Sequence, residues 1–395
     1  MRIFFVNRFY WPEEPATAQL LRDLATHLAR TGWEVGVITS RPDSTAFRHE
    51  WHEAVAIHRV RSTRWGKTSL PGRVLDFLTF HLAALWKALR LLSRGDVLVA
   101  LTDPPLIGVP LSLAAGLRGA RLIHWVQDIY PEIAVELTGH RWLLALRPLR
   151  DLAWRRAEAC VAPGTDMTRA LARAKVPPAR IVVSENWAPE GVGPTTEDRV
   201  RALRESWGLQ GKFVVGYSGN LGRVHGLDAV LELAAALRGE PDFLFQFIGD
   251  GPRRVSLQRE AAARGLTNLR FLPVQPRAQL SSTLAVPDVH LVTLLPGAEA
   301  CVFPSKLYGI AAVGRPVLFL GPPGCELARL VVGRRMGAAF TRAEAVEAAA
   351  WVRRLQSDAD ARHAMGAAAR AFAAHGLDRA ASRWQELLRG TLAAR

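Results

Sequence analysis

The feature that most constrains this chain is a regular alternation of short apolar runs with longer segments of helical periodicity. In the first half, amphipathic segments such as residues 16–30 and 75–92 separate runs rich in β-branched and aromatic residues. This alternation is typical of βαβ units, which place parallel strands in one sheet and helices on its faces. The predicted strands of this half are residues 1–7, 34–39, 55–60, 97–101, 121–127, 159–162 and 181–183.

A second series of the same kind follows a break in the pattern. Residues 189–198 are rich in Pro, Gly and Thr and have no periodicity, which is typical of a linker. We predict an α/β fold with two Rossmann-like domains, residues 1–194 and 195–376, and a helix at 377–395 that packs back towards the first domain. The predicted strands of the second half are residues 213–217, 243–249, 269–272, 289–294 and 317–320.

The charge and the cysteines limit the compartment and the partners. Lys and Arg number 51 against 36 Asp and Glu, and this net charge of +15 favours a polyanion, a membrane surface or phosphorylated ligands. The widely spaced Cys160, Cys301 and Cys325 predict neither a disulfide framework nor a metal site. The start of the chain lacks a signal-peptide pattern, and the uncharged residues 104–117 are too few for a spanning helix. We therefore expect a cytoplasmic protein that does not cross a membrane.

Three glycine-containing motifs of the second half suggest a site for a phosphorylated ligand. Residues 213–226 run from a strand through a glycine-rich turn towards a helix, an arrangement that suits a diphosphate, although an ordinary tight turn has the same pattern. Residues 247–252 (FIGDGP) end another strand, where ligands of open α/β sheets bind. In residues 303–316, Pro304 and Ser305 are expected to start a helix that directs Lys306 towards the same crevice. A solvated surface lysine is the alternative for Lys306.

These motifs, in this order, resemble the family 4 glycosyltransferases of GT-B fold, and the resemblance covers nearly the whole chain. A subgroup with similar segments includes the fucosyl- and N-acetylfucosaminyl-transferases of exopolysaccharide and O-antigen assembly. The segments that carry the resemblance are FYWPEEPATAQLLRDLATHLARTGWEVGVIT, LTDPPLIGVPLSLAAGLRGARLIHWVQDIYPE, YSGNLGRVHGLDAVLELAAAL, FIGDGP, LRFLPVQP and VFPSKLYGIAAVGRPVLF.

The resemblance implies a metal-independent hexosyltransferase without cofactor, whose two domains face each other across a cleft. Arg223 and Lys306 would stabilise the charge that develops on the leaving diphosphate of a UDP- or GDP-linked sugar. The donor-binding residues that it implies are Gly219, Asn220, Gly222, Arg223, Gly249, Gly251, Phe271, Leu272, Ser305, Lys306 and Glu326.

The sequence departs from the family pattern at two places. The family's E-x7-E signature aligns with Cys301 and Gly309, so Glu299 or Glu326 would have to replace the missing carboxylates; a helix cap is the alternative for Glu326. The family's loop histidine, which contacts the donor sugar, aligns with Gln127. Its loss is compatible with a 6-deoxy donor sugar such as fucose or N-acetylfucosamine.

Asp128 is the candidate catalytic carboxylate of the first half. It follows a predicted strand, where it could activate or orient an acceptor hydroxyl, or cap a turn. Glu132 is a second carboxylate of this kind, and Pro15 and Thr17 in the opening loop are further acceptor-binding candidates. The stereochemistry stays open, because a retaining enzyme can use the departing phosphate as the base.

Residues 59–94 concentrate much of the positive charge. This segment contains eight basic residues and one acidic residue, Asp76, with apolar residues interspersed among them. This pattern favours an anionic membrane surface, and a core helix with a solvated basic rim is the alternative. Arginines around Trp142 and Trp154 could extend the same face. The candidate membrane residues are Arg61, Arg64, Trp65, Lys67, Arg73 and Trp86.

The sequence therefore predicts a glycosyltransferase of cell-surface polysaccharide assembly, peripheral on the inner face of the plasma membrane. Its acceptor would be a polyprenyl-diphosphate-linked saccharide. A nucleotide-sugar epimerase of the same fold and a non-catalytic polyanion- or membrane-binding scaffold are the alternatives. Nucleic acid is not an expected partner, because the chain has no zinc spacing, RNA-binding motif or helix-turn-helix pattern.

Overall fold

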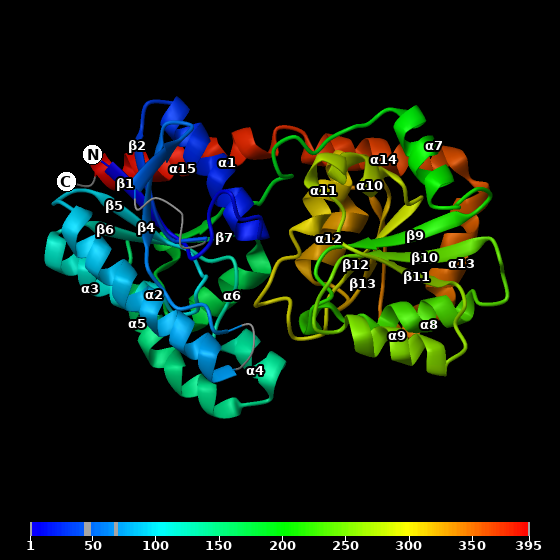
Figure 1. Cartoon of the computed structure of the whole chain (residues 1–395), viewed down its shortest axis with the longest axis horizontal. Coiled ribbons are helices and arrows are strands. Elements are labelled where there is room, and N and C mark those ends of the chain that lie inside the picture. The colour runs from blue at the N-terminus through cyan, green and yellow to red at the C-terminus, as the bar shows by residue number, and fades with distance from the viewer. Residues whose placement is uncertain (1, 43–48, 67–69, 394–395) are drawn as a thin grey trace. The chain divides into compact units, whose positions relative to one another are not determined.

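A computed structural model describes residues 2–42, 49–66 and 70–393 of the chain. The chain folds into two compact units, which we treat separately (Figure 1). Unit 1 contains Met1–Asn186, Ala300–Phe303 and Leu377–Arg395, and unit 2 contains Trp187–Glu299 and Pro304–Gly376. The chain thus passes from unit 1 to unit 2 just before the linker predicted at 189–198. The last segment of the chain belongs to unit 1.

Unit 1 is built on an eight-stranded sheet of order β3-β4-β2-β1-β5-β6-β7-β8. All neighbouring strands are parallel except β3 and β4, which pair antiparallel. The strands are β1 (Arg2–Val6), β2 (Glu34–Ser40), β3 (His49–His52), β4 (Val55–Val60), β5 (Val97–Ala100), β6 (Arg121–Trp125), β7 (Ala159–Ala162) and β8 (Ile181–Val183).

Helices cover both faces of this sheet. The helices α2 (Leu70–Leu91), α3 (Gly108–Arg118) and α5 (Arg147–Arg156) lie side by side on one face, and α1 (Ala16–Arg30) and α15 (Gly376–Ala393) lie on the other (Figure 1). The shorter elements are α4 (Glu132–Thr138), the 3-10 turn η1 (Arg141–Leu146), α6 (Thr165–Arg173) and η2 (Pro178–Arg180).

The C-terminal helix α15 completes the core of unit 1. Its Trp384 is fully buried, with ring centroids 5.1 Å from Trp125 of β6 and 6.2 Å from Phe5 of β1. Gln385 of the same helix donates a hydrogen bond to Thr31, which follows α1. A residue near the end of the chain therefore fills the face of a sheet whose first strand begins at Arg2.

Unit 2 has a six-stranded parallel sheet of order β11-β10-β9-β12-β13-β14. Helices α8, α9 and α13 lie on one face, and α10, α11 and α14 on the other (Figure 1). The strands are β9 (Phe213–Ser218), β10 (Phe243–Ile248), β11 (Leu269–Leu272), β12 (Val289–Thr293), β13 (Val317–Leu320) and β14 (Gly337–Phe340). The helices are α7 (Glu197–Ser206), α8 (Asp228–Ala236), α9 (Arg254–Ala263), α10 (Leu280–Ala285), α11 (Lys306–Ala312), α12 (Glu326–Gly333), α13 (Ala345–Ser357) and α14 (Ala359–Ala373), with 3-10 turns η3 (Arg223–His225), η4 (Arg277–Gln279) and η5 (Arg342–Glu344).

The predicted strands are confirmed to within one or two residues at their ends, and the helix predicted at 16–30 is confirmed at both ends. Two edge strands were not predicted. β3 has the sequence HEWH, and β14 has the sequence GAAF. Neither sequence shows apolar alternation or enrichment in β-branched residues. These two segments are therefore strands because they pair with β4 and β13. The helix predicted at 75–92 begins earlier, at Leu70.

Candidate functional site

Each sheet has a point where the order of the strands reverses, and open α/β sheets bind ligands outside the carboxyl ends of the strands at such a point. In unit 2 this point lies between β9 and β12, and in unit 1 it lies between β1 and β5. Most candidate site residues follow one of these strands or an immediate neighbour.

In unit 2, the loops after β9 and β10 pack backbone against backbone. A Cβ atom on Gly249 would lie 2.0 Å from the carbonyl oxygen of Gly219, and one on Gly251 would lie 2.5 Å from Asn220 Oδ1. Gly219 has φ +132°, a conformation that side chains other than glycine rarely adopt. The structure therefore brings Gly219, Asn220, Gly249 and Gly251 together, and each glycine has a steric reason.

Lys306, the first residue of α11, lies against this turn. A Cβ atom on Gly219 would lie 3.6 Å from Lys306 Nζ, and Nζ itself is 3.5 Å from the centroid of the Tyr217 ring. Nζ is buried and makes no hydrogen bond within the described part of the chain. Desolvation lowers the pKa of Lys306 well below its ordinary value. A buried amine without a partner is costly, so this position favours an anionic ligand.

His225 is a site residue that the sequence reasoning missed. It ends η3, and a Cβ atom on Gly222 would lie 3.3 Å from its Cδ2. Burial, and then the charge of Lys306, lowers the pKa of His225 to about 3, against a backbone hydrogen bond with Thr293 that raises it. The imidazole is therefore neutral at physiological pH. Its sequence signal was a histidine between two glycines of the turn, GRVHG.

The other predicted donor residues of unit 2 lie at the same edge of the sheet. Phe271 stacks on Phe247 with ring centroids 4.9 Å apart, and the N–H of Gly249 donates to the carbonyl of Leu272 at 3.5 Å. Arg223 begins η3 with an exposed side chain. Glu326 begins α12, beyond the carboxyl end of β13.

Ser305 directly precedes α11, so the helix starts where it was expected, but the side chain of Ser305 does not cap it. Ser305 has helical dihedral angles, whereas an N-cap side chain normally bonds from an extended backbone. Ser305 therefore stays a candidate only through its place beside Lys306.

The positions of the missing E-x7-E glutamates carry no carboxylate. The carbonyl of Cys301 accepts from the N–H of Ile129 at 2.9 Å, and Gly309 lies buried inside α11. Burial raises the pKa of Cys301 to about 11, so its thiol is protonated. The carboxylate of Glu299 accepts from the N–H of Gly297 at 2.7 Å, so it stabilises its own turn. Glu326, the other candidate, lies at the start of α12.

In unit 1, two carboxylates follow neighbouring strands. Asp103 comes after β5 and pairs with Arg8 at 3.2 Å, and the backbone N–H of Asp128, after β6, donates to Thr102 at 3.2 Å. Burial, and then the charge of Asp103, raises the pKa of Asp128 to about 7. A carboxyl group with such a pKa can take a proton near neutral pH. Asp128 was predicted as a site residue from the sequence, whereas Asp103 and Arg8 were not.

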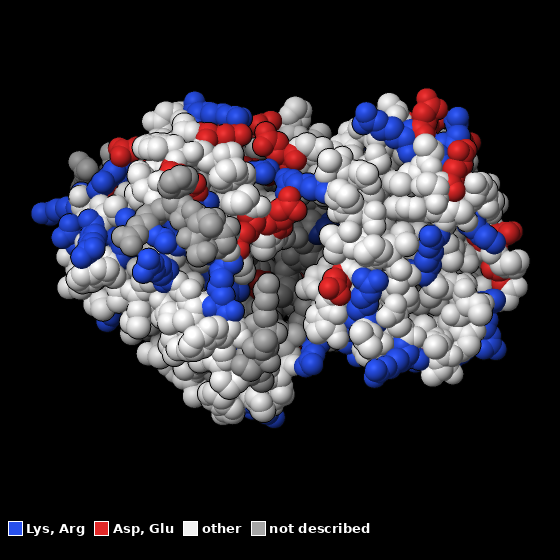
Figure 2. Space-filling model, viewed as in Figure 1, with Lys and Arg blue, Asp and Glu red and all other residues white. Residues whose placement is uncertain are grey.

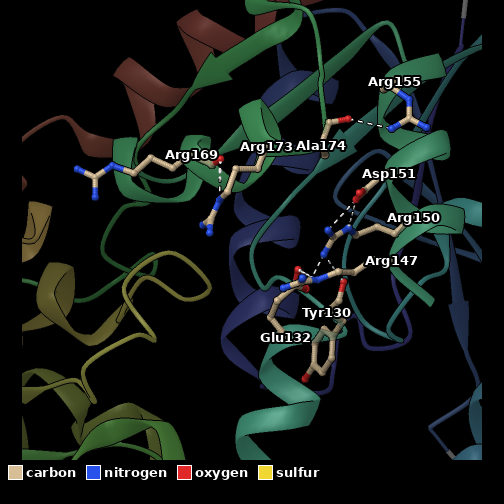
Figure 3. Close-up of polar contacts among 9 residues, drawn as sticks. All are labelled: Tyr130, Glu132, Arg147, Arg150, Asp151, Arg155, Arg169, Arg173 and Ala174. Carbon is tan, nitrogen blue, oxygen red and sulfur yellow. Dashed lines mark hydrogen bonds and ion pairs between the residues drawn. The ribbon is translucent and has the colours of Figure 1, made fainter. Parts of the chain in front are cut away.

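Glu132 lies in an ion-pair network of its own. Its carboxylate pairs with Arg147 at 2.7 Å and with Arg150 at 2.6 Å, and Arg150 also binds Asp151 at 2.7 Å (Figure 3). Arg150 further donates to the carbonyl of Tyr130. Both oxygens of Glu132 are thus used to fix the start of α4, which argues against an acceptor-binding role.

The remaining candidates of unit 1 differ in accessibility. Gln127 is buried and exchanges two hydrogen bonds of 2.9 Å with Asn186, so its amide is used within the unit. Pro15 is the exposed N-cap residue of α1, and Thr17 is half-buried in the first turn of that helix. Both lie in the segment that follows β1, at the edge where Asp103 and Asp128 also lie.

The predicted membrane residues are exposed where the structure describes them. Trp65 and Trp86 have 62% and 59% of their surface exposed, and Arg61, Arg64 and Arg73 are exposed as well. Lys67 lies outside the described residues. The proposed extension around Trp154 is wrong in part, because Trp154 and Arg150 are buried, whereas Trp142 is exposed. No helix among the described residues is long and apolar enough to cross a membrane.

Comparisons with known proteins identify the family. A model described as "Glycosyl transferase 4-like domain" matches residues 16–187, and one described as "Glycosyl transferases group 1" matches residues 200–372. The chain is a family 4 glycosyltransferase. Its activity is transfer of a sugar from a nucleotide-sugar donor.

Relatives and solved structures agree with this assignment. The chain is 28% identical over 350 residues to WcaI of Escherichia coli K12, assigned by name to colanic acid biosynthesis, across 84% of this chain and 86% of that protein. It is 32% identical to WbjE of Pseudomonas aeruginosa, named as a glycosyltransferase, across 60% of each chain. The crystal structure of HepE from Anabaena with UDP-glucose matches all of both chains with a TM-score of 0.76 at 18% identity, which shows the GT-B fold.

Proposed function

We propose that this glycosyltransferase moves a sugar from a UDP- or GDP-linked donor to a polyprenyl-diphosphate-linked saccharide in cell-surface polysaccharide assembly. The observation that carries the donor half is the buried, unpartnered Lys306 Nζ beside Gly219. The relative assigned by name to colanic acid biosynthesis supports the polysaccharide role.

The donor diphosphate lies in unit 2, along Gly219, Asn220, Gly222, Gly249 and Gly251. A bound diphosphate raises the pKa of Lys306 again, because an opposite charge at close range opposes the effect of desolvation. It then stabilises the negative charge that grows on the leaving diphosphate, and Arg223 adds a second cation from the rim of the turn. This stabilisation needs no metal ion.

The neutral imidazole of His225 supports the same step. Its low pKa keeps a second positive charge away from Lys306 when the site is empty. The N–H of the neutral ring donates to the backbone of Thr293, so the other ring nitrogen can accept a hydrogen bond from a hydroxyl group of the donor. The base of the nucleotide lies against residues 271–274, and Glu326 binds a hydroxyl group of the donor.

The acceptor binds to unit 1 beside Asp128, with Pro15 and Thr17 at the same edge. Asp128 orients the acceptor hydroxyl or accepts its proton, since burial, and then the charge of Asp103, raises its pKa to about 7. At the position of the family's loop histidine, both polar atoms of Gln127 bond to Asn186 within unit 1. A donor sugar without a 6-hydroxyl, such as that of a fucose or N-acetylfucosamine nucleotide, needs no hydrogen-bond partner at this position.

The lipid carrier places the enzyme on an anionic membrane, and the outer face of α2, α3 and α5 suits that surface. This apolar face consists of the exposed residues Val74, Leu78, Leu82, Trp86, Leu113, Leu117, Leu149 and Leu152. The exposed large hydrophobic residues of unit 2, among those described, are valines only. A groove of about 650 Å³ lies between α3 and α5. An apolar area of this extent on one side of a unit is typical of an interaction surface.

The charge around the apolar face agrees with this role. Asp76, the acidic residue of the basic segment, is buried and accepts hydrogen bonds from the N–H groups of Trp65 and Gly66. Arg90 lies over the Trp86 ring at 4.5 Å. Figure 2 shows Lys and Arg side chains over much of this side of unit 1, including its top, whereas Asp and Glu side chains lie mainly in its upper half. Exposed cations around apolar side chains match an anionic bilayer.

Calorimetric titration of the full chain with UDP and GDP tests the donor half. One of the two nucleotides should bind, and the variant Lys306→Met should lose that binding. A scaffold with a degenerate site would bind neither nucleotide. An epimerase would bind the nucleotide, but it would convert the donor sugar in the absence of any acceptor.

A further inference from the structure

Unit 2 contains a cavity that the proposed function does not use. Its volume is about 530 Å³. The cavity is lined by residues at the starts of three strands. These are Gly211, two residues before β9, Asp288, directly before β12, and Pro316, directly before β13. The strands are parallel, so this cavity lies at the amino end of the sheet, and Gly219 and Asn220 follow β9 at the carboxyl end. Helices α7 and α14 supply the remaining walls.

Two glycines bring arginines together at this cavity. Arg362, Gly366 and Arg370 lie four residues apart on one face of α14. A Cβ atom on Gly366 would lie 2.2 Å from the carbonyl oxygen of Gly314, and one on Gly314 would lie 2.2 Å from Arg370 Nη1. The helix therefore packs directly on the loop before β13, and that loop contains Arg315.

The guanidinium groups at the cavity outnumber their carboxylate partners. Burial lowers the pKa of Arg315, and the charge of Asp288 raises it. The neighbouring cations Arg204, Arg370 and Arg362 lower this pKa further. The Nε of Arg315 is buried without a hydrogen-bond partner among the described residues.

The carboxylate at this cluster is already engaged. Oδ2 of Asp288 accepts from Arg204 at 3.2 Å and from the N–H of Val214 at 2.7 Å. In the parts of the chain that the structure describes, Arg315, Arg362 and Arg370 form no ion pair. The exposed Glu197 and Glu205 of α7 line the cavity as well, so the uncompensated charge is concentrated at α14 and Arg315.

We propose that this cavity is a binding site for a small phosphorylated anion with two or more negative charges. Guanidinium groups that outnumber the nearby carboxylates repel one another, and a multiply charged anion removes that repulsion. The planar donor forks of arginine match phosphoryl oxygens in pairs. The site lies at the opposite end of the sheet from the proposed donor site at Lys306.

The test uses the full chain with Arg223→Ala and Lys306→Ala, which removes the donor site as a source of binding. Inorganic diphosphate is titrated by calorimetry, and potassium chloride at the same ionic strength serves as the reference. We expect saturable binding of diphosphate and none of chloride. Adding Arg370→Gln should weaken the binding by about tenfold or more, the loss typical of one charge-assisted hydrogen bond.

A matched control removes the same charge elsewhere in unit 2. Arg259 on α9 is exposed and does not line the cavity, so Arg259→Gln should leave the affinity unchanged. Thermal melts of both variants verify that unit 2 is folded. The proposal is overturned if the donor-silenced chain shows no saturable binding, or if Arg370→Gln and Arg259→Gln bind diphosphate equally. Because the donor site is already silenced, this result does not depend on the proposed transfer reaction.

Discussion

The ammonium group of Lys306 lies 3.5 Å from the centre of the Tyr217 ring and has no hydrogen-bond partner in the described structure. The ring face offers some compensation through a cation–π interaction, but it does not replace the lost hydration. The hydroxyl of Tyr217 donates to the carbonyl of Asn220 at 2.7 Å, which fixes the ring below the glycine-rich turn. In the free protein, the charged form of this buried amine is thus destabilised at the place where we propose that the donor diphosphate binds.

Replacing this lysine should separate stability from activity. Lys306→Met keeps the length of the side chain and removes the buried amine, so we expect a higher melting temperature without donor and no transferase activity. Burial lowers the pKa of Lys306 in the native state well below the ordinary value of 10.5, which applies to the unfolded chain. At pH values between the native pKa and 10.5, the unfolded chain therefore binds more protons than the native state. The free energy of unfolding of the unmodified protein should therefore rise as pH increases towards 10.5, and this rise should be smaller in the variant.

Lys212 provides the matched control for that substitution. Its Nζ donates to the carbonyl of Pro241 near the surface of the same unit. Lys212→Met should retain transfer and the donor-induced rise in melting temperature. Equal activity of Lys306→Met and Lys212→Met would contradict a diphosphate-binding role for Lys306.

The pH dependence of the rate should report Asp128. Its pKa of about 7 predicts that the rate of transfer rises with pH through that value, because only the carboxylate accepts a proton. Asp103→Asn removes the neighbouring charge that raises this pKa, so the acid limb of the rate profile should move to lower pH. Asp198→Asn, at an exposed position on α7, should leave the profile in place. An acid limb that does not move in Asp103→Asn would show that the two carboxyl groups are not coupled.

The raised pKa of Asp128 should also make the free energy of unfolding fall as pH rises. Asp128 keeps its proton in the native state up to about pH 7, whereas the ordinary value for an unfolded chain is 3.8. The native state therefore binds more protons between these values, and the free energy of unfolding falls as pH rises through that window. Asp128→Asn should reduce this fall, which urea titrations at pH 5 and pH 8 would measure.

Binding to vesicles should depend on the apolar face of α2. The double variant Leu82→Ser/Trp86→Ser should lower the partition coefficient on vesicles with anionic lipid by about tenfold or more, because two large apolar side chains lose their burial. Trp51→Ser is the matched control, since Trp51 is 66% exposed on β3, outside this face. The apolar face could instead bind a second copy of this chain, and light scattering of the free protein tests this. A concentration-dependent dimer that the double variant abolishes would assign the face to that second copy.

The C-terminal helix should be required for the stability of unit 1. Trp384→Ala removes a fully buried side chain between Phe5 and Trp125, and large-to-small changes of this kind cost about 3–5 kcal/mol. Trp142→Ala, at a position 69% exposed, should change the free energy of unfolding by less than about 0.5 kcal/mol. Equal urea midpoints for the two variants would contradict the packing role of α15.

The fold was predictable because it depends on patterns within single elements. The apolar runs of β1, β5 and β9 are buried from both faces, and strands of this kind read clearly in a sequence. The turn glycines were also predictable, since Gly219, Gly249 and Gly251 follow predicted strands. Their partners were not, because the contact of Gly249 with Gly219 depends on the pairing of β10 with β9.

The electrostatics of the site could not be predicted, because they depend on burial and on side chains distant in the sequence. Asp103 raises the pKa of Asp128 across two adjacent strands, and Lys306 lowers that of His225 across a long segment of chain. Glu132 illustrates the opposite outcome. Its sequence position matched a second catalytic acid, but Arg147 and Arg150, more than a helix away, take both of its oxygens.

The most direct test of the proposed function is the mass of the product formed from a panel of UDP- and GDP-linked sugars with a synthetic polyprenyl-diphosphate saccharide. We predict that one donor extends the acceptor by one sugar and releases its nucleotide diphosphate, and that Lys306→Met forms no product. Preference for a 6-deoxy sugar over its 6-hydroxy counterpart would support the interpretation of Gln127. An unchanged acceptor mass with every donor, or an epimerised donor in place of an extended acceptor, would contradict the account.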